Sequence, residues 1–418
     1  MRRSLWENLD YAILFVWFCL IFIGLAAIYS ATNGPSAEII DPQMRQNFGK
    51  QLGFFFICMV MMVVVMSLPV RFFMSAAMGI YAFMILLVIA ARFIGKEING
   101  AHSWIMIGGF GLQTSEFAKV ATALALGWVM SRAKSNTWDI KSAATGIGLL
   151  ILPAAILIFV QNDTGTGLVF LSLVPMILFW SGMPLHWVSL MITPAIAGYL
   201  TIIYEPAALV FSGVVVVALF FATRDWKLIA LGGAAGFGTW GSFQVLYKLL
   251  LPHQVARIKA LGNPEEYALT TGYQTLQSKA AIGSGGFMGK GWMQGLQTQM
   301  GNVPEQSTDF VYTVIGEEFG FLGSFLVLVL FAILLVRLIR TTSRINHPFA
   351  QYFFVSTVGI FLTHILINIG MTVGSMPVIG IPLPFISYGG SALMANTALL
   401  AIAMNFQMRA HEFPAHGY

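Results

Sequence analysis

Charged residues are scarce along the whole chain. Asp, Glu, Lys and Arg make up 9% of the 418 residues, whereas hydrophobic residues make up 57%. A soluble globule needs far more charged side chains than this to cover its surface. Apolar runs long enough to cross a bilayer recur along the sequence instead. The composition therefore excludes a soluble globular protein and predicts an all-α polytopic membrane protein.

Cysteine is equally rare, because only Cys19 and Cys58 are present. Both lie inside apolar runs, which favours packing within the membrane over a disulfide. The net charge of +5 could indicate nucleic-acid binding, but the basic residues lie between the apolar runs. Membrane orientation explains them better, so no nucleic-acid partner is expected. The first apolar run lacks a small-residue cleavage site, which predicts a retained helix rather than a signal peptide.

The hydrophobic pattern predicts about twelve transmembrane helices in one integral-membrane domain spanning residues 1–418. Several of the runs are short and would need polar flanks to complete a crossing. The predicted spans are 11–30, 53–68, 72–93, 116–131, 143–160, 167–182, 186–203, 207–222, 228–250, 312–336, 351–373 and 389–408.

Lys and Arg set the expected orientation. If the spans alternate, most basic residues of the short loops lie on one side, which the positive-inside rule assigns to the cytoplasm. Both termini are then cytoplasmic, and a large extracytoplasmic loop covers 251–310. The other segments expected outside are 31–52, 94–115, 161–166 and 374–388.

The large loop is the longest polar stretch between spans, and such loops are usually functional. Its GSGGFMGKG run lacks the spacing of a nucleotide-binding P-loop. In PEQSTDF, Ser307 is expected to cap the next helix, which would place Asp309 in the first turn, where the helix dipole favours the ionised carboxylate. An ionised acid at this surface could act as a general base toward a sugar hydroxyl, and capping alone is the alternative.

Two further outer segments carry acids near helix ends. Ser115 is expected to cap the fourth span, with Glu116 in its first turn and Lys119 three residues on, within pairing distance. A capped helix end with a snorkelling lysine is the alternative. Asp163, in QNDTGTG, is either a helix cap or a functional acid at the membrane edge.

The last outer segment, 368–391, is rich in proline and glycine. Pro377, Pro382 and Pro384 exclude a continuous helix there. Irregular backbone at membrane depth is tolerated only against protein or a water-filled cavity. The segment is therefore predicted to line a cavity beneath the large loop. Glu317 and Glu318, which open an apolar span, are expected to be paired or functional.

Together these segments resemble the SEDS family of polymerases, over essentially the whole chain. The matching motifs are WENLDY, YSAT, G-x-x-x-W with QTSE and Lys119, QNDTGTG, HQVARI, SKAAIGSGG with GKG, PEQSTDF followed by GEE, and PxxGxPLPFxSYGGS. The amino-acid sequences of the large loop and of the SYGGSAL motif resemble the RodA type more than the FtsW type. The family typically has ten spans, so the resemblance predicts an extra helix pair within 186–226.

The resemblance implies a peptidoglycan glycosyltransferase that joins lipid II units at the outer face of the bacterial cytoplasmic membrane during cell elongation. The family's essential aspartate falls on Asp309, the expected general base toward the acceptor 4-hydroxyl, with undecaprenyl pyrophosphate as leaving group. A divalent cation, Mg²⁺ or Mn²⁺, is a candidate cofactor. Candidates to offset the pyrophosphate charge or to shape the substrate cavity are Arg257, Lys279, Lys290, Trp104, Glu116, Lys119, Asp163 and Ser387.

The expected partners are a class B penicillin-binding protein that supplies transpeptidase activity and other membrane proteins of the elongation complex. Three alternatives stay open at this point. A division polymerase of the FtsW type would use the same chemistry. A lipid II flippase would move the lipid without lengthening it, although its path should carry polar groups through the midplane. A scaffold that only recruits the transpeptidase would not need Asp309.

Overall fold

The computed structural model describes residues 9–34, 42–98, 101–108, 110–132, 140–246, 266–267 and 272–413. Within them lie twelve helices of at least 16 residues, one for each predicted span. They are α1 (Tyr11–Asn33), α3 (Asn47–Ser67), α4 (Val70–Ile94), α5 (Thr114–Met130), α6 (Ile140–Ala155), α7 (Thr164–Trp180), α8 (Leu185–Ile203), α9 (Glu205–Thr223), α10 (Trp226–Leu246), α15 (Gly320–Arg344), α16 (Pro348–Thr372) and α17 (Gly390–Met408).

In this described part, eight helices are long and apolar enough to cross a membrane. The all-α polytopic prediction is therefore confirmed. Short helices complete the set: α2 (Pro42–Arg45), α12 (Tyr273–Gly285), α13 (Leu296–Gln299), α14 (Val311–Glu318) and a 3-10 turn at Ala410–Glu412.

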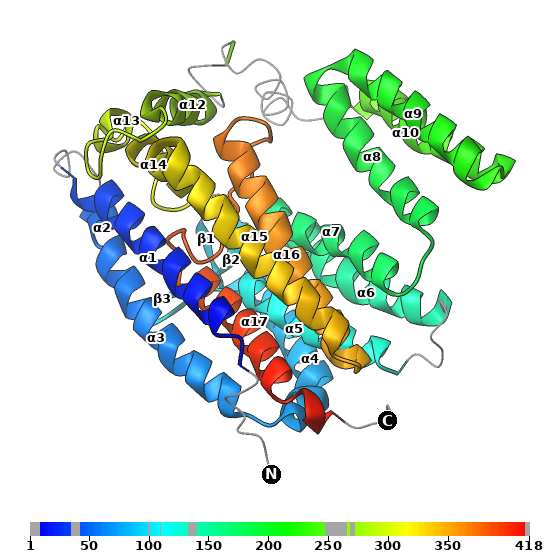
Figure 1. Ribbon diagram of the computed structural model, residues 1–418, viewed down its shortest axis with the longest axis horizontal. Coiled ribbons are helices and arrows are strands. Elements are labelled where there is room, and N and C mark those ends of the chain that lie inside the picture. Colours follow the sequence, from blue (N-terminus) through cyan, green and yellow to red (C-terminus); the bar gives the residue numbers. More distant parts are fainter. Residues whose placement is uncertain are drawn as a thin grey trace.

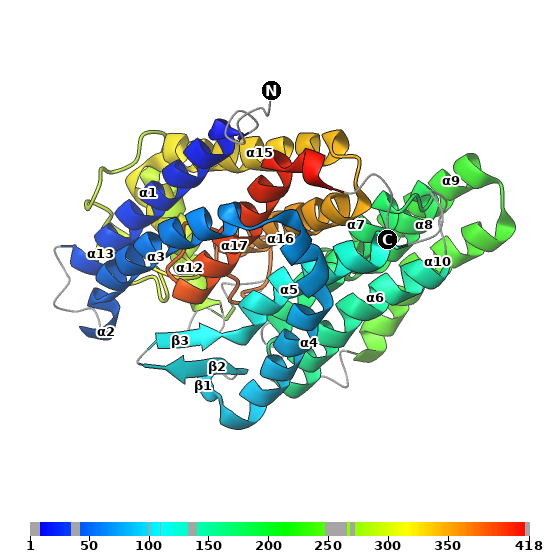
Figure 2. The same cartoon turned by 90° about the horizontal axis from the view of Figure 1, so that it is seen from below.

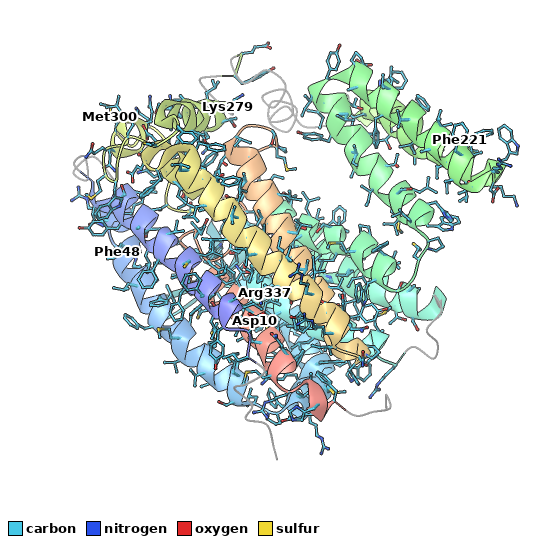
Figure 3. All side chains as sticks on the ribbon, in the orientation of Figure 1. Asp10, Phe48, Phe221, Lys279, Met300 and Arg337 are labelled. Atoms are coloured by element: carbon cyan, nitrogen blue, oxygen red, sulfur yellow. The ribbon has the colours of Figure 1, made fainter. Side chains whose placement is uncertain are left out.

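The centre of the bundle is built from α5, α16 and α17, whose side chains are buried on nearly every face. A helix that is apolar all round belongs inside such a bundle. The helices α1, α3, α4 and α15 pack around this centre (Figure 1). The N-cap Asp10 of α1 pairs with Arg337 of α15, with 3.2 Å between Oδ2 and the guanidinium, and the two are labelled side by side in Figure 3.

The helix α6 contains a proline and continues into a π-helical turn, Ile156–Val160. Pro153 lies inside α6 and has no N–H, so it leaves the carbonyl of Leu149 without its helical donor. The hydroxyl of Tyr81, on α4, donates to that carbonyl at 3.0 Å. A neighbouring helix thus satisfies the freed backbone group, as burial in a membrane bundle requires.

The helices α8, α9 and α10 pack mainly on each other and stand apart from the main bundle in Figure 1. Leu190, Leu219, Leu228 and Ile229 form a small core of their own. The hydroxyl of Tyr199 reaches back to the carbonyl of Ser375. The predicted extra helix pair within 186–226 falls in this group and stays a prediction.

A small antiparallel sheet lies where only an outer loop was expected. Its strands are β1 (Lys96–Ile98), β2 (Ala101–Ile107) and β3 (Phe110–Gln113), paired in the order β1–β2–β3 (Figure 2). Trp104 pairs with Gln113 in the β2–β3 register. Ser391, at the start of α17, binds β3 by accepting from Gln113 N and donating to the carbonyl of Gly111, both at 3.0 Å.

The predicted span 312–336 is interrupted. Gly320 has φ +64°, a left-handed conformation in which a Cβ would lie 2.3 Å from the backbone nitrogen of Gly289. Glycine at such a position ends a helix, so α14 stops at Glu318 and α15 begins anew. The expected interruption in 368–391 is confirmed, because residues 375–389 between α16 and α17 are not helical.

Candidate functional site

Asp309 lies in the turn that precedes α14, not inside the helix. The N-cap position is Phe310, without a side-chain cap, so two sequence predictions were wrong: Ser307 does not cap the helix, and Asp309 is not in its first turn. The Ser307 hydroxyl instead accepts from Nδ2 of Asn47 at 3.2 Å. The local sequence favoured a cap, but contacts with α3 and with the 375–389 segment decide the conformation here.

The carboxyl of Asp309 faces the irregular 375–389 segment. A Cβ added at Gly380 would lie 3.3 Å from Asp309 Oδ2, so the carboxyl and this glycine are in close proximity. Burial, and secondarily the charge of Glu305, raise the pKa of Asp309 to about 7. The predicted preference for the ionised form is therefore corrected: low solvation and a neighbouring acid oppose ionisation here.

The backbone around Asp309 is held by α16. Nδ2 of Asn368 donates to the carbonyl of Asp309 at 2.9 Å and to the carbonyl of Ile381 at 2.7 Å. One buried amide thus joins the Asp309 turn to the 375–389 segment. Both contacts use Nδ2, whereas the buried Oδ1 of Asn368 has no partner among the described residues.

Ser387 adds a second tie between the same two segments. Its hydroxyl donates to the carbonyl of Thr308 at 2.6 Å and accepts from Leu383 N at 2.8 Å. Tyr388 N donates to the carbonyl of Ser307 at 2.8 Å. Ser387 therefore positions the Asp309 turn, and its predicted contact with substrate stays a prediction.

One helical turn along α16 from Asn368, a buried polar triad joins α5 to α16. Nζ of Lys119 donates to Glu116 Oε1 at 2.9 Å and to His364 Nε2 at 2.7 Å. His364 Nδ1 lies 2.9 Å from the carbonyl of Pro382, which only accepts, so the imidazole carries its proton on Nδ1. The predicted Glu116–Lys119 pair is confirmed, and side-chain exposures of 2% and 0% exclude a snorkelling lysine.

Asp163 caps the N-terminus of α7. Its Oδ1 accepts from Thr166 N at 3.0 Å, and its Oδ2 accepts from the hydroxyl of Ser115 at 3.1 Å. Ser115 was predicted to cap α5, but the N-cap position is Gln113 and Ser115 turns to Asp163 instead. Gly165, two residues on, contacts Ile379 and Ile381, so α7 abuts the segment that faces Asp309.

The structure thus gathers Asp309, the Glu116–Lys119–His364 triad and Asp163 around residues 375–389. The sequence model of a protein family, the FtsW/RodA/SpoVE cell cycle proteins, matches residues 10–207 and 206–412 of this chain. The chain belongs to this family. The two matches adjoin each other and together cover nearly the whole chain.

Named relatives agree with this assignment. The peptidoglycan glycosyltransferase RodA of Treponema pallidum is 30% identical, over 97% of this chain and 98% of its own length. A solved chain from a peptidoglycan synthase complex that coordinates polymerization and crosslinking superposes with a TM-score of 0.71 at 23% identity, covering 96% of this chain and 98% of its own. The Thermus thermophilus rod shape determining protein RodA gives a TM-score of 0.61 at 23% identity, covering 96% and 97%.

The basic residues proposed for this FtsW/RodA/SpoVE protein differ in their surroundings. Arg257 lies outside the described residues. Lys290 pairs with the fully buried Glu317 at 3.2 Å, so its charge is already balanced. Lys279 is exposed on α12, and its side chain lies against Gly374 at the end of α16 (Figure 3). Of the two that the structure describes, Lys279 is placed better for an incoming anion.

Of the two acids of the GEE motif, Glu317 is paired with Lys290, as predicted, whereas Glu318 has only neutral hydrogen-bond donors around it among the described residues. Glu317 also accepts from the backbone N–H groups of Gln297 and Thr298, each at 2.9 Å. Glu318 accepts from Gln299 at 3.1 Å and from the hydroxyl of Ser30. They therefore hold the outer loop and α1 onto α14.

Three residues that build the site escaped the sequence prediction: His364, Asn368 and Gly380. A signal for the first two was present, because polar residues four apart on one face of an apolar span are usually functional. Gly380, with φ +77°, was only one of several glycines in its segment. Trp104 is half-buried on β2, and its role toward substrate stays a prediction.

The residues that the structure describes do not supply a complete ligand set for a divalent cation. Among the described residues, no three His, Cys, Asp or Glu side chains converge as a metal site would require. Asp309 and Glu305 are two neighbouring carboxylates, and Mg²⁺ is commonly held by one or two carboxylates together with substrate phosphates. The cation stays a proposal, and no step below depends on it.

Proposed function

We propose that Asp309 is the general base with which this protein polymerises lipid II. The protein is a peptidoglycan glycosyltransferase, as its relatives are. The proposal rests mainly on one observation: the carboxyl of Asp309 is held beside Gly380 with a pKa raised to about 7. A catalytic base is most effective when its pKa lies near the working pH.

The proposed step transfers one proton and one glycosyl group. The ionised Asp309 takes the proton of the acceptor 4-hydroxyl as that oxygen bonds to the donor anomeric carbon. The bond from this carbon to the pyrophosphate breaks, and undecaprenyl pyrophosphate leaves with the electron pair. The buried triad and the amide of Asn368 support the turn and the 375–389 segment that hold Asp309.

We also propose the setting of the reaction. The basic residues of the short loops support an orientation with both termini in the cytoplasm and the Asp309 turn at the outer face of the bacterial cytoplasmic membrane. The proposed partner is a class B penicillin-binding protein, together with other membrane proteins of the elongation complex. The likeness to a chain from a synthase complex that couples polymerization to crosslinking supports this.

The test is polymerisation of labelled lipid II by the purified protein, with and without a class B penicillin-binding protein. We expect glycan ladders whose lengths grow with time. Transfer of lipid II across vesicle membranes without ladders would support the flippase alternative instead. If neither occurs while the protein still binds its transpeptidase partner, the scaffold alternative would hold.

Glu305→Gln is expected to shift the pH dependence of polymerisation to lower pH. The base is active when ionised, so the rate should fall as pH drops through about 7, the pKa of Asp309. The negative charge of Glu305 raises that pKa, so its removal lowers the pKa, whereas the larger effect of burial remains. The measurement is the initial rate between pH 5.5 and 8.5, roughly one and a half units on either side of neutrality. If the acidic limb of the pH profile does not shift, the charge of Glu305 does not influence the pKa of Asp309.

Lys279→Ala and Lys290→Ala are expected to act on different quantities. Loss of the exposed Lys279 should slow polymerisation and leave the melting temperature almost unchanged. Loss of Lys290 leaves Glu317 without its cation, which should lower the melting temperature because Glu317 is buried. Rates and thermal unfolding of both variants decide this, and the reverse pattern would remove Lys279 from the site.

A further inference from the structure

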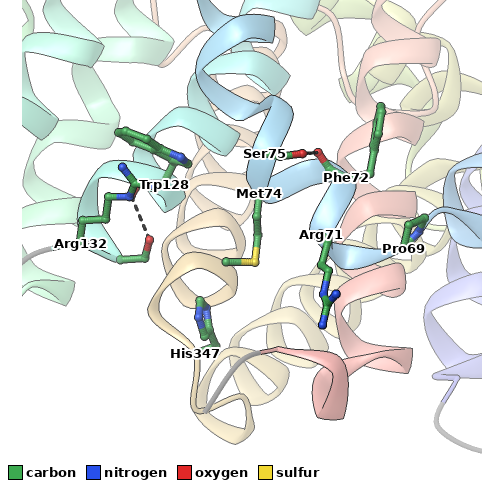
Figure 4. Close-up of a pocket in the computed structure, with 9 residues that line it drawn as sticks. Pro69, Arg71, Phe72, Met74, Ser75, Trp128, Arg132 and His347 are labelled. Atoms are coloured by element: carbon green, nitrogen blue, oxygen red, sulfur yellow. Dashed lines mark hydrogen bonds between the residues drawn. The ribbon is translucent and has the colours of Figure 1, made fainter. Parts of the chain in front are cut away.

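A pocket of about 600 Å³ lies at the end of the bundle opposite to Asp309. It forms where the start of α4, the end of α5 and the N-cap of α16 meet (Figure 4). Asn368, which holds Asp309, lies near the other end of α16, about 30 Å along the helix axis. The pocket is therefore separate from the site described above, and its size is typical of a ligand-binding cavity.

The charge of this pocket has one sign. Arg71 and Arg132 line it, and none of its lining residues is an acid. Within the part of the chain that the structure describes, neither arginine forms an ion pair. The guanidinium of Arg132 lies over the ring of Trp128, 3.7 Å from its centroid, which fixes it at the wall by a cation–π interaction. An anion would find two uncompensated charges here.

A buried donor without an acceptor points at the same ligand. His347 is 7% exposed, and its Nδ1 accepts from Phe349 N at 3.2 Å. A neutral imidazole that accepts at Nδ1 carries its proton on Nε2, and burial lowers the pKa of His347, which keeps it neutral. Nε2 has no partner among the described residues, although the ring lines the pocket (Figure 4). Leaving such a donor unmatched is unfavourable, and a bound anion would satisfy it.

We propose that this pocket binds the phosphate-bearing headgroup of an anionic phospholipid. The positive charges of Arg71 and Arg132 would attract the headgroup into the pocket, and Nε2–H of His347 would donate to the phosphate. The apolar side chains of Phe72 and Met74 and the ring of Trp128 line the same pocket and suit the glycerol and the upper acyl chains. Phe72 is 45% exposed, so this apolar surface continues out of the pocket toward the membrane. A soluble anion would make no contact with this apolar surface.

The test uses the full-length protein in an uncharged detergent, titrated with phosphatidylglycerol or phosphatidylcholine and followed by native mass spectrometry. We expect phosphatidylglycerol to bind and phosphatidylcholine not to. Arg71→Gln/Arg132→Gln should weaken binding by at least about tenfold, since two positive charges that attract the headgroup are lost. The matched control is Arg340→Gln/Arg344→Gln, which removes two exposed charges at the same end of the bundle, outside the pocket. It should bind like the wild type.

Several results would overturn the proposal. Equal binding of the two lipids would do so, as would equal losses in the pocket and control variants. Normal binding by the pocket variant would leave an acidic segment of a partner protein as the alternative occupant. Inorganic phosphate that raises the melting temperature as much as the lipid does, through the same arginines, would make the ligand a soluble anion. If the double variant does not fold, His347→Asn decides, because Asn keeps an N-cap acceptor but removes Nε2–H.

Discussion

Asp309→Asn should reduce lipid II polymerisation by about 10²–10⁴-fold, the usual contribution of a general base. Asparagine has nearly the same volume and keeps the backbone carbonyl that Asn368 holds at 2.9 Å. The turn should therefore keep its conformation, while the side chain can no longer accept the proton of the acceptor hydroxyl. The measurement is the initial rate of glycan formation at saturating lipid II, at a pH above the wild-type limb near 7.

Glu305→Gln is the matched control for this variant. It also changes an acid to its amide, four residues away in the same turn, and at high pH it should polymerise at nearly the wild-type rate. Thermal unfolding of both variants checks that they remain folded. If Asp309→Asn retained most of the wild-type rate, another group would have to accept the proton, and Asp309 would keep only a structural role.

Lys119→Met should destabilise the protein by about 3–5 kcal/mol, the usual effect of removing one partner from a buried ion pair. Methionine fills a similar volume, so little packing is lost. The carboxylate of Glu116, however, stays buried without its cation, and His364 loses the donor to its Nε2. Because His364 also holds the carbonyl of Pro382, the 375–389 segment should become less ordered. Reversible unfolding in mixed detergent micelles measures the change.

The double variant Glu116→Gln/Lys119→Met separates charge from packing. With the buried carboxylate neutralised, most of the lost stability should return, and the difference from the two single variants gives the coupling energy. If Lys119→Met and the double variant lose the same free energy of unfolding, the buried charge of Glu116 contributes little to the destabilisation. Polymerisation by the double variant, measured at a temperature where it is folded, shows whether the triad also supports the Asp309 site.

The membrane architecture could be predicted almost fully from the sequence. Each predicted span contains a long helix, although 312–336 is divided between α14 and α15, because a run of apolar residues in a bilayer has few conformations besides an α-helix. Pro377, Pro382 and Pro384 likewise predicted a break whatever their neighbours. Asp309 was found by its place in a motif, and the Glu116–Lys119 pair by its spacing.

The sequence by itself thus determined the helices, their interruption and the list of polar residues, since these depend on local hydrophobicity and backbone restriction. Only the tertiary structure decided which polar groups meet. His364 binds the carbonyl of Pro382, and Asn368 binds the carbonyl of Asp309, which is far away in the sequence. Ser115 donates to Asp163 instead of capping its own helix. The protonation of Asp309 also depended on the tertiary structure. The expected helix dipole predicted an ionised acid, but burial among distant segments raises the pKa of Asp309. The sequence could not show this, because the solvation of a carboxyl group depends on everything packed around it.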